Sequence, residues 1–420
     1  MVAFRIDTDI AIVGNGDLIQ NASVVIEDNK IVYAGENEHA PSIEKTLQAQ
    51  VLMPGMWDCH VHFSGVKIPS LELMVVSDPL VGVLNCVSDA RDTLRSGFTS
   101  VRDLAGFGIQ LNKAIRSNDI EGPTIYGAGR MLSMTAGHAD IPGVQLDVYH
   151  HLQSVNKHIS GELVDGVSEC YVAVRKQIRS GAGVIKFSAS GGIFPELEIE
   201  GYTRVDRPSH QQFSDEEQRV IVEEATRAEL AVAAHCHGEK GIESAIKAGV
   251  TTVEHGTYLT EELADLMVEH DTIFVPTRYA YEKLIENSSK LGLKEKSVAK
   301  LHEICDLHAN AVKFAIKKGV KIAAGTDITT SGNSGFDKPG ENALELKYLV
   351  DLGMTPMDAI VAATGNGALS VGQKGVGKGL IKSGYEADLL LLKENPLNDI
   401  EILADINNIS QIIKQGNFIL

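Results

Sequence analysis

Two histidines stand one residue apart at the end of an apolar run, in the stretch MPGMWDCHVHF at residues 53–63. Residues i and i+2 of a β-strand point to the same face, so His60 and His62 converge if this stretch is extended. A lone inward histidine is usually a hydrogen-bonded core residue, whereas two imidazoles on one face are typical of a site for Zn²⁺ or a related divalent ion. The pair therefore indicates a metal site.

Other apolar runs also carry strongly polar residues, among them Lys186 in GVIKF, His235 in AVAAHCHG, His255 in TTVEHG and Asp327 in KIAAGTD. An ammonium group is costly to bury, so a purely structural Lys186 would need a partner carboxylate. Four histidines, a lysine and an aspartate at one place would make a poor core and a good metal cluster. We therefore predict one metal site, built from His60, His62, Lys186, His235, His255 and Asp327.

The elements that must position these residues alternate between apolar strands and amphipathic helices. The expected strands are 56–62, 98–104, 124–129, 183–190, 231–238, 251–257, 272–277 and 321–327. A helical pattern at 214–230 begins with Ser-x-x-Glu, a capping box. Continuous apolar strands between helices are typical of a parallel sheet covered on both faces. Eight such units favour an α/β fold with a closed (β/α)₈ barrel of TIM type, in which catalytic residues lie at the C-terminal ends of the strands.

Both ends of the chain instead show apolar–polar alternation with Asn-Gly, Gly-Asp and Asp-Asn pairs at hairpin spacing. We predict that residues 1–56 and 371–420 together form a small β-sandwich domain of short antiparallel strands. Residues 57–370 would then form the barrel. The segments 141–172 and 191–213 lack periodicity and are expected to be loops over the barrel mouth.

Composition limits the partners and the compartment. The 420 residues include 56 acidic and 38 basic ones, a net charge of -18, which repels phosphate backbones and anionic lipid. Neither nucleic acid nor a membrane is therefore expected as a partner. There is no signal-peptide pattern and no apolar run long enough for a membrane span. The five scattered cysteines indicate no disulfide framework, and Cys59 and Cys236 are interpreted as small buried strand residues. A cytoplasmic protein is expected.

The motifs DCHVHF, GVIKFSASGG, AAHCHG, VEHGT and AAGTD follow one another in the order found in the amidohydrolase superfamily, which this chain resembles over nearly its whole length. More narrowly, MPGMWDCHVHF, TSVRDLAGFG and TAGHADI resemble the branch of Xaa-Pro and Xaa-Arg dipeptidases and ochratoxinase-like enzymes. The resemblance implies two divalent metal ions. Zn²⁺ is the preferred assignment for both, although the ligand types also suit Mn²⁺ and Fe²⁺. It assigns one ion to His60, His62 and Asp327, the second to His235 and His255, and a bridging carbamate, formed with CO₂, to Lys186.

The same resemblance implies catalytic roles for two residues. Asp327 would take the proton from the attacking water, which the ions activate, and deliver it to the leaving amine. His138 in MTAGHAD would stabilise the oxyanion or grip the substrate, although a structural loop role fits it equally well. His237 lies at i+2 from His235 and faces the same cavity, so it is a candidate substrate contact, as is Tyr258.

Four charged residues beside these motifs have mainly structural interpretations. Arg204 and Arg207 could bind a substrate carboxylate, but surface charge is the simpler interpretation. Arg102 and Asp103 follow each other in VRDLAG and are expected to form a structural ion pair.

The function that the resemblance implies is that of a metal-dependent amidase, a carboxypeptidase or dipeptidase that releases a C-terminal amino acid. Its small-molecule substrate would be a dipeptide, an N-acyl amino acid or an ochratoxin-like aryl amide. An alternative is a cyclic-amide or urea hydrolase of the same superfamily. A catalytically silent scaffold would lack one or more metal ligands, and here all the predicted ligands are present. A homo-oligomer is expected, because oligomers are common in this branch.

Overall fold

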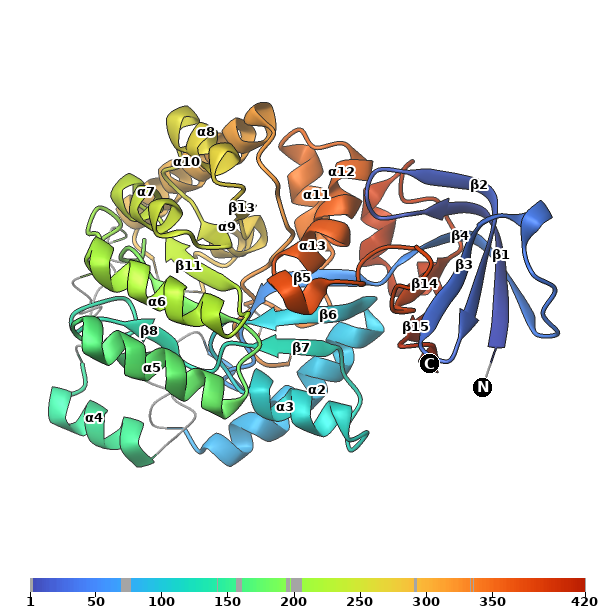
Figure 1. The fold of residues 1–420 in the computed structure, drawn as a ribbon. Coiled ribbons are helices and arrows are strands. Elements are labelled where there is room, and N and C mark those ends of the chain that lie inside the picture. The colour runs from blue at the N-terminus through green and yellow to red at the C-terminus, as the bar shows by residue number, and fades with distance from the viewer. Residues whose placement is uncertain are drawn as a thin grey trace.

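The computed structural model describes residues 3–68, 77–141, 143–155, 161–193, 197, 206–290, 293–332, 334 and 336–419. Within these residues the fold is α/β, with one mixed seven-stranded sheet and two sheets of six and three parallel strands. Figure 1 shows the seven-stranded sheet at one side of the molecule, where the blue N-terminal and red C-terminal parts of the chain meet. The parallel strands and most helices lie on the other side.

The seven-stranded sheet is built from both ends of the chain. Its strands are β1 (Ala3–Ile12), β2 (Leu18–Glu27), β3 (Lys30–Glu36), β4 (Thr46–Pro54), β14 (Leu389–Leu392), β15 (Ile409–Lys414) and β16 (Asn417–Ile419), in the order β16-β15-β14-β4-β1-β2-β3. The sheet curls on itself, because the ring of Phe418 on β16 lies 4.9 Å from that of Phe4 on β1. The β1–β4 pair is parallel, so the sheet is mixed and not wholly antiparallel as expected.

The Pro-Gly pair between β4 and β5 has a steric cause. Strand β4 ends at Pro54, and the next strand begins at Met56. A Cβ atom on Gly55 would overlap the side chain of Thr99, so glycine is required at this close approach. The sheet of the two termini thus passes directly into the strand that carries His60.

The parallel strands are β5 (Met56–Val61), β6 (Phe98–Asp103), β7 (Thr124–Gly127), β8 (Met131–Ser133), β9 (Gly161–Leu163), β10 (Ile185–Ser188), β11 (Val232–Cys236), β12 (Thr252–His255) and β13 (Ile273–Val275). Seven of the parallel strands coincide with expected ones, whereas the short strands β8 and β9 were not expected, and the last expected strand, 321–327, is not a regular strand. The eighth expected strand is the extended segment 321–328, which forms isolated bridges to β5 and β13.

Backbone hydrogen bonds connect the edges of the two parallel sheets. The amide of Cys59 on β5 donates to the carbonyl of Ala324 at 2.8 Å. The amide of Ala323 donates to the carbonyl of Phe274 on β13 at 2.9 Å. On the other side, the amide of Gly183 before β10 donates to Gly127 of β7 at 2.8 Å. Segment 321–328 therefore lies between β13 and β5, and β7 lies beside β10.

Helices follow most of these strands. They are α2 (Pro79–Arg95), α3 (Gly108–Arg116), α4 (Leu146–Val155), α5 (Val167–Ser180), α6 (Asp215–Arg227), α7 (Glu239–Ala248), α8 (Glu261–Glu269), α9 (Arg278–Glu286), α10 (Glu295–Lys318), α11 (Leu344–Asp351), α12 (Pro356–Ala362) and α13 (Gly365–Leu369). The predicted capping box is confirmed, because Ser214 and Glu217 each bond to the other's backbone amide at the start of α6. The segment 141–172 is not simply a loop, since it contains α4, β9 and the start of α5.

The apolar side chains of strands and helices form the main core. On α6, for example, Val220, Ile221 and Ala225 are buried, and they share this core with Ile185 and Val232 from β10 and β11. Burying one such aliphatic side chain contributes roughly 1.5–3 kcal/mol, which fixes the strands that carry the polar residues of interest.

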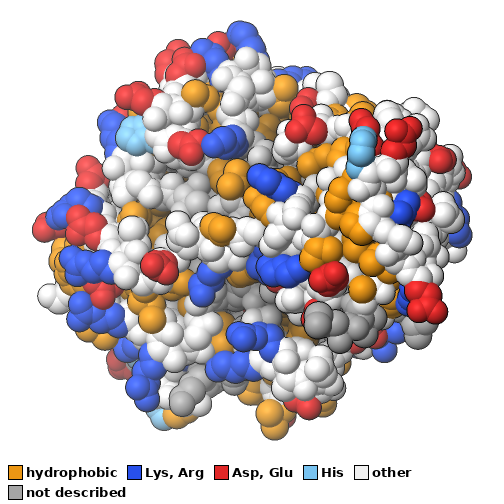
Figure 2. All heavy atoms as spheres, turned by 45° about the vertical axis from the view of Figure 1, so that its right-hand side comes forward, with side chains coloured by type: hydrophobic (Ala, Val, Ile, Leu, Met, Phe, Trp, Pro, Cys, Tyr) orange, Lys and Arg blue, Asp and Glu red, His pale blue; other side chains and the backbone are white. Residues whose placement is uncertain are grey.

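The surface carries charges of both signs. Figure 2 shows one face on which Lys and Arg side chains are interspersed with acidic and apolar ones, despite the net charge of -18. All five cysteines are buried and free. No helix in the described ranges is both long and apolar enough to cross a lipid bilayer.

Candidate metal centre

All of the predicted metal ligands except Lys186 lie in two adjacent groups, one of which also contains His237, predicted as a substrate contact. In each group, one nitrogen or oxygen atom per residue lies within 4.8 Å of the others; the groups are His60, His62 and Asp327, and His235, His237 and His255. The two groups meet where the rings of His60 and His255 lie 4.8 Å apart, centroid to centroid. Residues from β5, β11, β12 and segment 321–328 thus converge, as the strand-end argument predicts.

The first group surrounds one carboxylate oxygen. The Nε2 atom of His62 lies 3.1 Å from Oδ1 of Asp327, and that of His60 lies 3.5 Å from the same oxygen. The amide of Asp327 donates to the carbonyl of His60 at 2.7 Å, which fixes the two segments in register. Burial alone would raise the pKa of Asp327, but the two imidazoles beside it hold the pKa below its usual value. Burial, together with Lys186, lowers the pKa of His60 to about 4, so this ring is neutral and can bind a metal ion.

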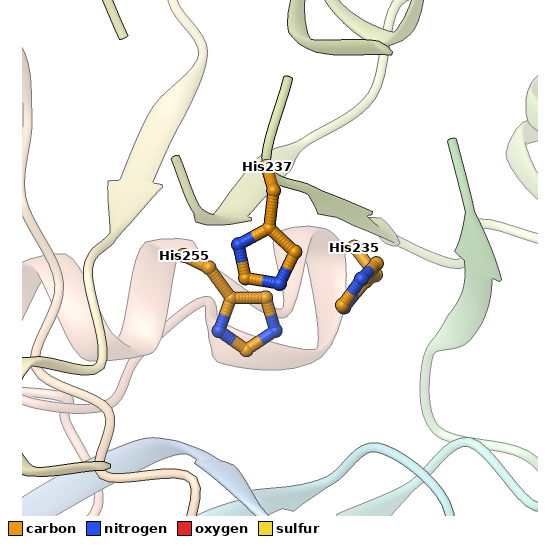
Figure 3. Close-up of side chains that lie close together, drawn as sticks. All are labelled: His235, His237 and His255. Atoms are coloured by element: carbon orange, nitrogen blue, oxygen red, sulfur yellow. The ribbon is translucent and has the colours of Figure 1, made fainter. Parts of the chain in front are cut away.

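The second group is formed by three imidazole rings from neighbouring strand ends. Figure 3 shows the rings of His237 and His255 side by side, with centroids 4.9 Å apart and planes inclined by 14°, and His235 edge-on to both. His255 has a φ of 69°, a left-handed conformation that costs energy in a non-glycine residue. This turn at the end of β12 lets both His255 and the preceding Glu254 point inward, although a regular strand would place them on opposite faces. By geometry alone, His237 could hold a metal ion together with His235 and His255.

Hydrogen bonds orient most of these rings through the Nδ1 atom. The partners are Oε2 of Glu254 for His60 (2.8 Å), the carbonyl of Ala105 for His62 (3.2 Å), Oγ1 of Thr257 for His237 (2.6 Å) and Oγ1 of Thr277 for His255 (2.8 Å). Occupying Nδ1 leaves Nε2 as the ligand atom, an arrangement that is characteristic of metal-binding histidines.

Lys186 lies on β10, beside the strand that carries His235. Its side chain is 1% exposed, and its Nζ atom has no hydrogen-bond partner among the described residues. The Nε2 atom of His235 likewise has none there. Burial lowers the pKa of Lys186 to about 8, although Glu254 and Asp327 oppose this effect. Unpartnered buried polar atoms are costly, so this donor set fits a metal centre better than it fits a core.

The predicted ion pair between Arg102 and Asp103 is wrong. Arg102 instead donates to Glu254 at 2.7 Å, and Asp103 accepts from the amide of Phe63 at 3.1 Å. Adjacent strand residues point to opposite faces, so the two side chains cannot meet. Glu254 was missed, although an acidic residue inside the apolar run TTVEHG is itself a signal that could have identified it.

His138 lies at the site, as the sequence suggested. Its ring stacks on that of His235, and its Nδ1 atom lies 3.0 Å from Oδ2 of Asp206. The amide of Gly192 donates to the same carboxylate oxygen at 2.9 Å. Sequence reasoning missed Asp206, which lies in the segment 191–213 that showed no interpretable pattern.

The remaining candidates lie less centrally. Tyr258 is half-buried, and its backbone amide donates to the carbonyl of His237 at 3.0 Å. Beside it, Thr257 joins His237 to the hydroxyl of Tyr281, which lies 2.6 Å from the threonine Oγ1 and was not predicted. Arg207 is exposed, in keeping with surface charge, and Arg204 lies outside the described residues.

Comparison with known proteins decides the family. Residues 51–419 match the Amidohydrolase family. The chain belongs to this family. It is 40% identical to ochratoxinase of Aspergillus niger over 422 aligned residues, which cover 97% of this chain and 84% of that protein. The resemblance inferred from the motifs is confirmed, and this amidohydrolase is a hydrolytic enzyme that acts on amide bonds.

Solved structures of similar proteins extend over the whole amidohydrolase chain. The crystal structure of A. niger ochratoxinase superposes with a TM-score of 0.89 at 38% identity and covers 99% of this chain and 95% of its own. A prolidase complexed with N-methylphosphonate-L-proline gives 0.87 at 28% identity, with 100% and 99% covered. A Xaa-Pro dipeptidase with methionine bound in the active site gives 0.83 at 30% identity, with both chains covered completely.

Proposed function

We propose that this amidohydrolase is a binuclear metal-dependent amidase that releases a C-terminal amino acid. Its substrate is a dipeptide, an N-acyl amino acid or an ochratoxin-like aryl amide. The observation that carries the proposal is the meeting of two groups of potential ligands at His60 and His255, with the buried, unpartnered Nζ of Lys186 on the adjoining strand β10. Such a constellation has no use as a core and fits two divalent ions.

The proposed assignment divides the ligands between two Zn²⁺ ions. His60, His62 and Asp327 would hold the first, His235 and His255 would hold the second, and Lys186, carboxylated on Nζ by CO₂, would be a ligand to both. Carboxylation turns a costly buried cation into an anionic ligand, which supports this role. His237 is kept as a substrate contact; its ring is parallel to that of His255, and Thr257 holds it on one side.

The ions, when bound, supply Lewis-acid activation of the attacking water and of the scissile carbonyl. Asp327 then acts through its carboxylate: it accepts the proton of the water and donates it to the nitrogen of the leaving amino acid. Its lowered pKa keeps it ionised and able to accept that proton at neutral pH. As an imidazolium, with Nδ1–H given to Asp206, His138 would donate Nε2–H to the oxygen that becomes negative.

The relatives support the class of substrate. The prolidase binds a phosphonate that carries L-proline, and the Xaa-Pro dipeptidase binds methionine. The relative with 40% identity is an ochratoxinase. Amides whose amine part is an amino acid are therefore the substrates to test first.

The proposed architecture follows the same comparison. The hydrogen bonds of segment 321–328 to β5 and β13, and that between β7 and β10, support a closed (β/α)₈ barrel within residues 57–370. Residues 1–56 and 371–420 would form the second domain around the sheet of both termini. We further propose that the chain works as a homo-oligomer on a small-molecule amide.

The experiment measures amino-acid release from a panel of dipeptides, N-acyl amino acids and ochratoxin A. Four samples are compared: metal-loaded parent, parent stripped with a chelator, Lys186→Ala, and Lys321→Ala as a control, because Lys321 only pairs with Asp271 at the surface. We expect release by the loaded parent and by the Lys321 variant alone. Release by the stripped parent would overturn metal dependence. No release at all, with hydrolysis of hydantoin-like rings or ureas instead, would replace the proposal by the cyclic-amide alternative.

A further inference from the structure

Glu254 is a fully buried carboxylate that uses both of its oxygens next to the metal centre. Its Oε2 atom lies 2.8 Å from Nδ1 of His60. Its Oε1 atom accepts from Nη2 of Arg102 at 2.7 Å and also from the hydroxyl of Thr252. Both Glu254 and Arg102 are 0% exposed. A carboxylate between a guanidinium and an imidazole is thus placed directly behind a predicted metal ligand.

Arg102 is held on several sides, which fixes the position of its charge. Its Nε donates to the carbonyl of Cys59 at 2.6 Å, and its Nη1 donates to Oγ1 of Thr252 at 3.0 Å and to the carbonyl of Ser370 at 3.2 Å. Taking an ion pair out of water costs several kcal/mol per ion, and apolar residues of equal size often stabilise a protein more. A contribution to stability therefore explains the buried Arg102–Glu254 pair poorly. The contact between Glu254 and His60 explains it better.

We propose that Glu254 and Arg102 are positioning residues that hold His60 as the tautomer protonated at Nδ1. In that tautomer the lone pair is on Nε2, the atom that faces Asp327 at 3.5 Å. Arg102 keeps Glu254 in place by donating to its other oxygen. The inference rests on the proposed metal function, because it gives His60 the role of a metal ligand. A carboxylate that hydrogen-bonds to a metal-binding histidine fixes the orientation of the ring and raises metal affinity.

The amide of a glutamine cannot replace this carboxylate. Arg102 and Nδ1–H of His60 are both donors, so residue 254 must offer two acceptor oxygens. Glutamine has one. If its oxygen faces Arg102, its NH₂ group faces His60, which must then carry its proton on Nε2 and loses the lone pair for the metal. If the side chain is reversed, two donors face each other at Arg102.

The experiment measures metal affinity rather than activity alone. Parent, Glu254→Gln and Glu345→Gln are loaded with Zn²⁺, and the ions are withdrawn by titration with a chelator. Glu345 is a matched control, because it is also 1% exposed but accepts from the backbone amides at the start of α9 and contacts no predicted ligand. We expect the affinity of one ion to fall by about 10- to 100-fold in Glu254→Gln and to stay unchanged in Glu345→Gln. The absorption spectrum of the Co²⁺-loaded form should change in parallel.

Two other results separate the possible failures. If the parent binds no metal, the proposed function itself fails. If the parent binds two ions and Glu254→Gln binds both with unchanged affinity and an unchanged Co²⁺ spectrum, the positioning role is overturned. Should Glu254→Gln not fold, Glu254→Asp replaces it: its carboxylate is one methylene too short to reach both Arg102 and His60, so the same fall in affinity is expected. Unchanged affinity in that variant would also overturn the proposal.

Discussion

The imidazole ring of His138 lies almost flat against that of His235, with the ring centroids 3.8 Å apart and the planes inclined by 18°. The side chain of His138 is 21% exposed, whereas that of Asp206, which lies 3.0 Å from its Nδ1 atom, is 2% exposed. His138 therefore stands between a buried partner and the accessible side of the candidate metal centre. A ring in this position can reach a substrate that approaches the proposed ions.

Replacing His138 by Ala should lower kcat by about 10²-fold or more, because one hydrogen-bond donor to the developing oxyanion is lost. Metal content should stay at the parent value, since His138 is not among the proposed ligands. Steady-state kinetics and elemental analysis of the same sample test both statements. Gly192→Ala is a complementary variant, because its Cβ would lie 2.7 Å from Cε1 of His138 and displace the ring. Loss of metal in His138→Ala would contradict the catalytic role and assign His138 to supporting His235.

Asp327→Asn should lose most of kcat, by about 10²- to 10⁴-fold, because an amide cannot accept the proton of the attacking water. Metal content should fall only partly, since the amide oxygen can still serve as a ligand and His60 and His62 remain. The measurement is kcat per bound metal ion. Activity that survives in this variant would show that another group moves the proton.

Carboxylation of Lys186 predicts a specific mass. The intact, metal-loaded protein, kept from acid, should be heavier than the sequence by one CO₂, and acid treatment should remove the increment. Lys186→Ala should lack it under all conditions. Native mass spectrometry makes the comparison, and electron density beyond Nζ in a crystal would give the same answer. A loaded, active protein without the added mass would rule the carbamate out.

We expect Glu345 to make the free energy of unfolding depend on pH. Burial raises its pKa from 4.5 to about 8, despite the two backbone amides that donate to it. The folded protein therefore keeps a proton that the unfolded chain releases, so the free energy of unfolding falls as pH rises between these two values. The fall is at most about 1.4 kcal/mol per pH unit. Urea unfolding near pH 5 and near pH 8 should show a smaller fall for Glu345→Gln than for the parent; an equal fall in both would contradict the assignment.

The cluster of polar side chains could be predicted, because each of them interrupts or ends an apolar run of the sequence. Burial of His60, Lys186 or Asp327 in such a run is costly without a function, so the residue type alone carries the signal. Most of the strands could also be predicted from the sequence, because they are short and continuously apolar. Strand β9 and helix α4 were not visible, because a three-residue strand and a partly exposed helix show no periodicity.

The contacts behind the ligands could not be predicted, because they depend on the backbone turn at a strand end. The period of two places Glu254 opposite His255, and only the positive φ of His255 lets both face inward. The period of two also excludes a contact between Arg102 and Asp103, and that argument was available from the sequence. The partner of Arg102 on β6 is Glu254 on β12. The two residues are 152 positions apart in the sequence, so no local pattern could pair them.

The placement of β14 beside β4 affects how the chain is made. Leu390 of β14 pairs with Met53 of β4, and nearly all of the chain that carries the catalytic site lies between them. During synthesis, the edge of β4 that pairs with β14 stays unpaired until that whole segment has left the ribosome. Unpaired strand edges promote aggregation. We expect a chain that ends before β14 to scatter light on refolding while the full chain stays clear. Assistance from a chaperone would then matter most in the interval before the last strands emerge.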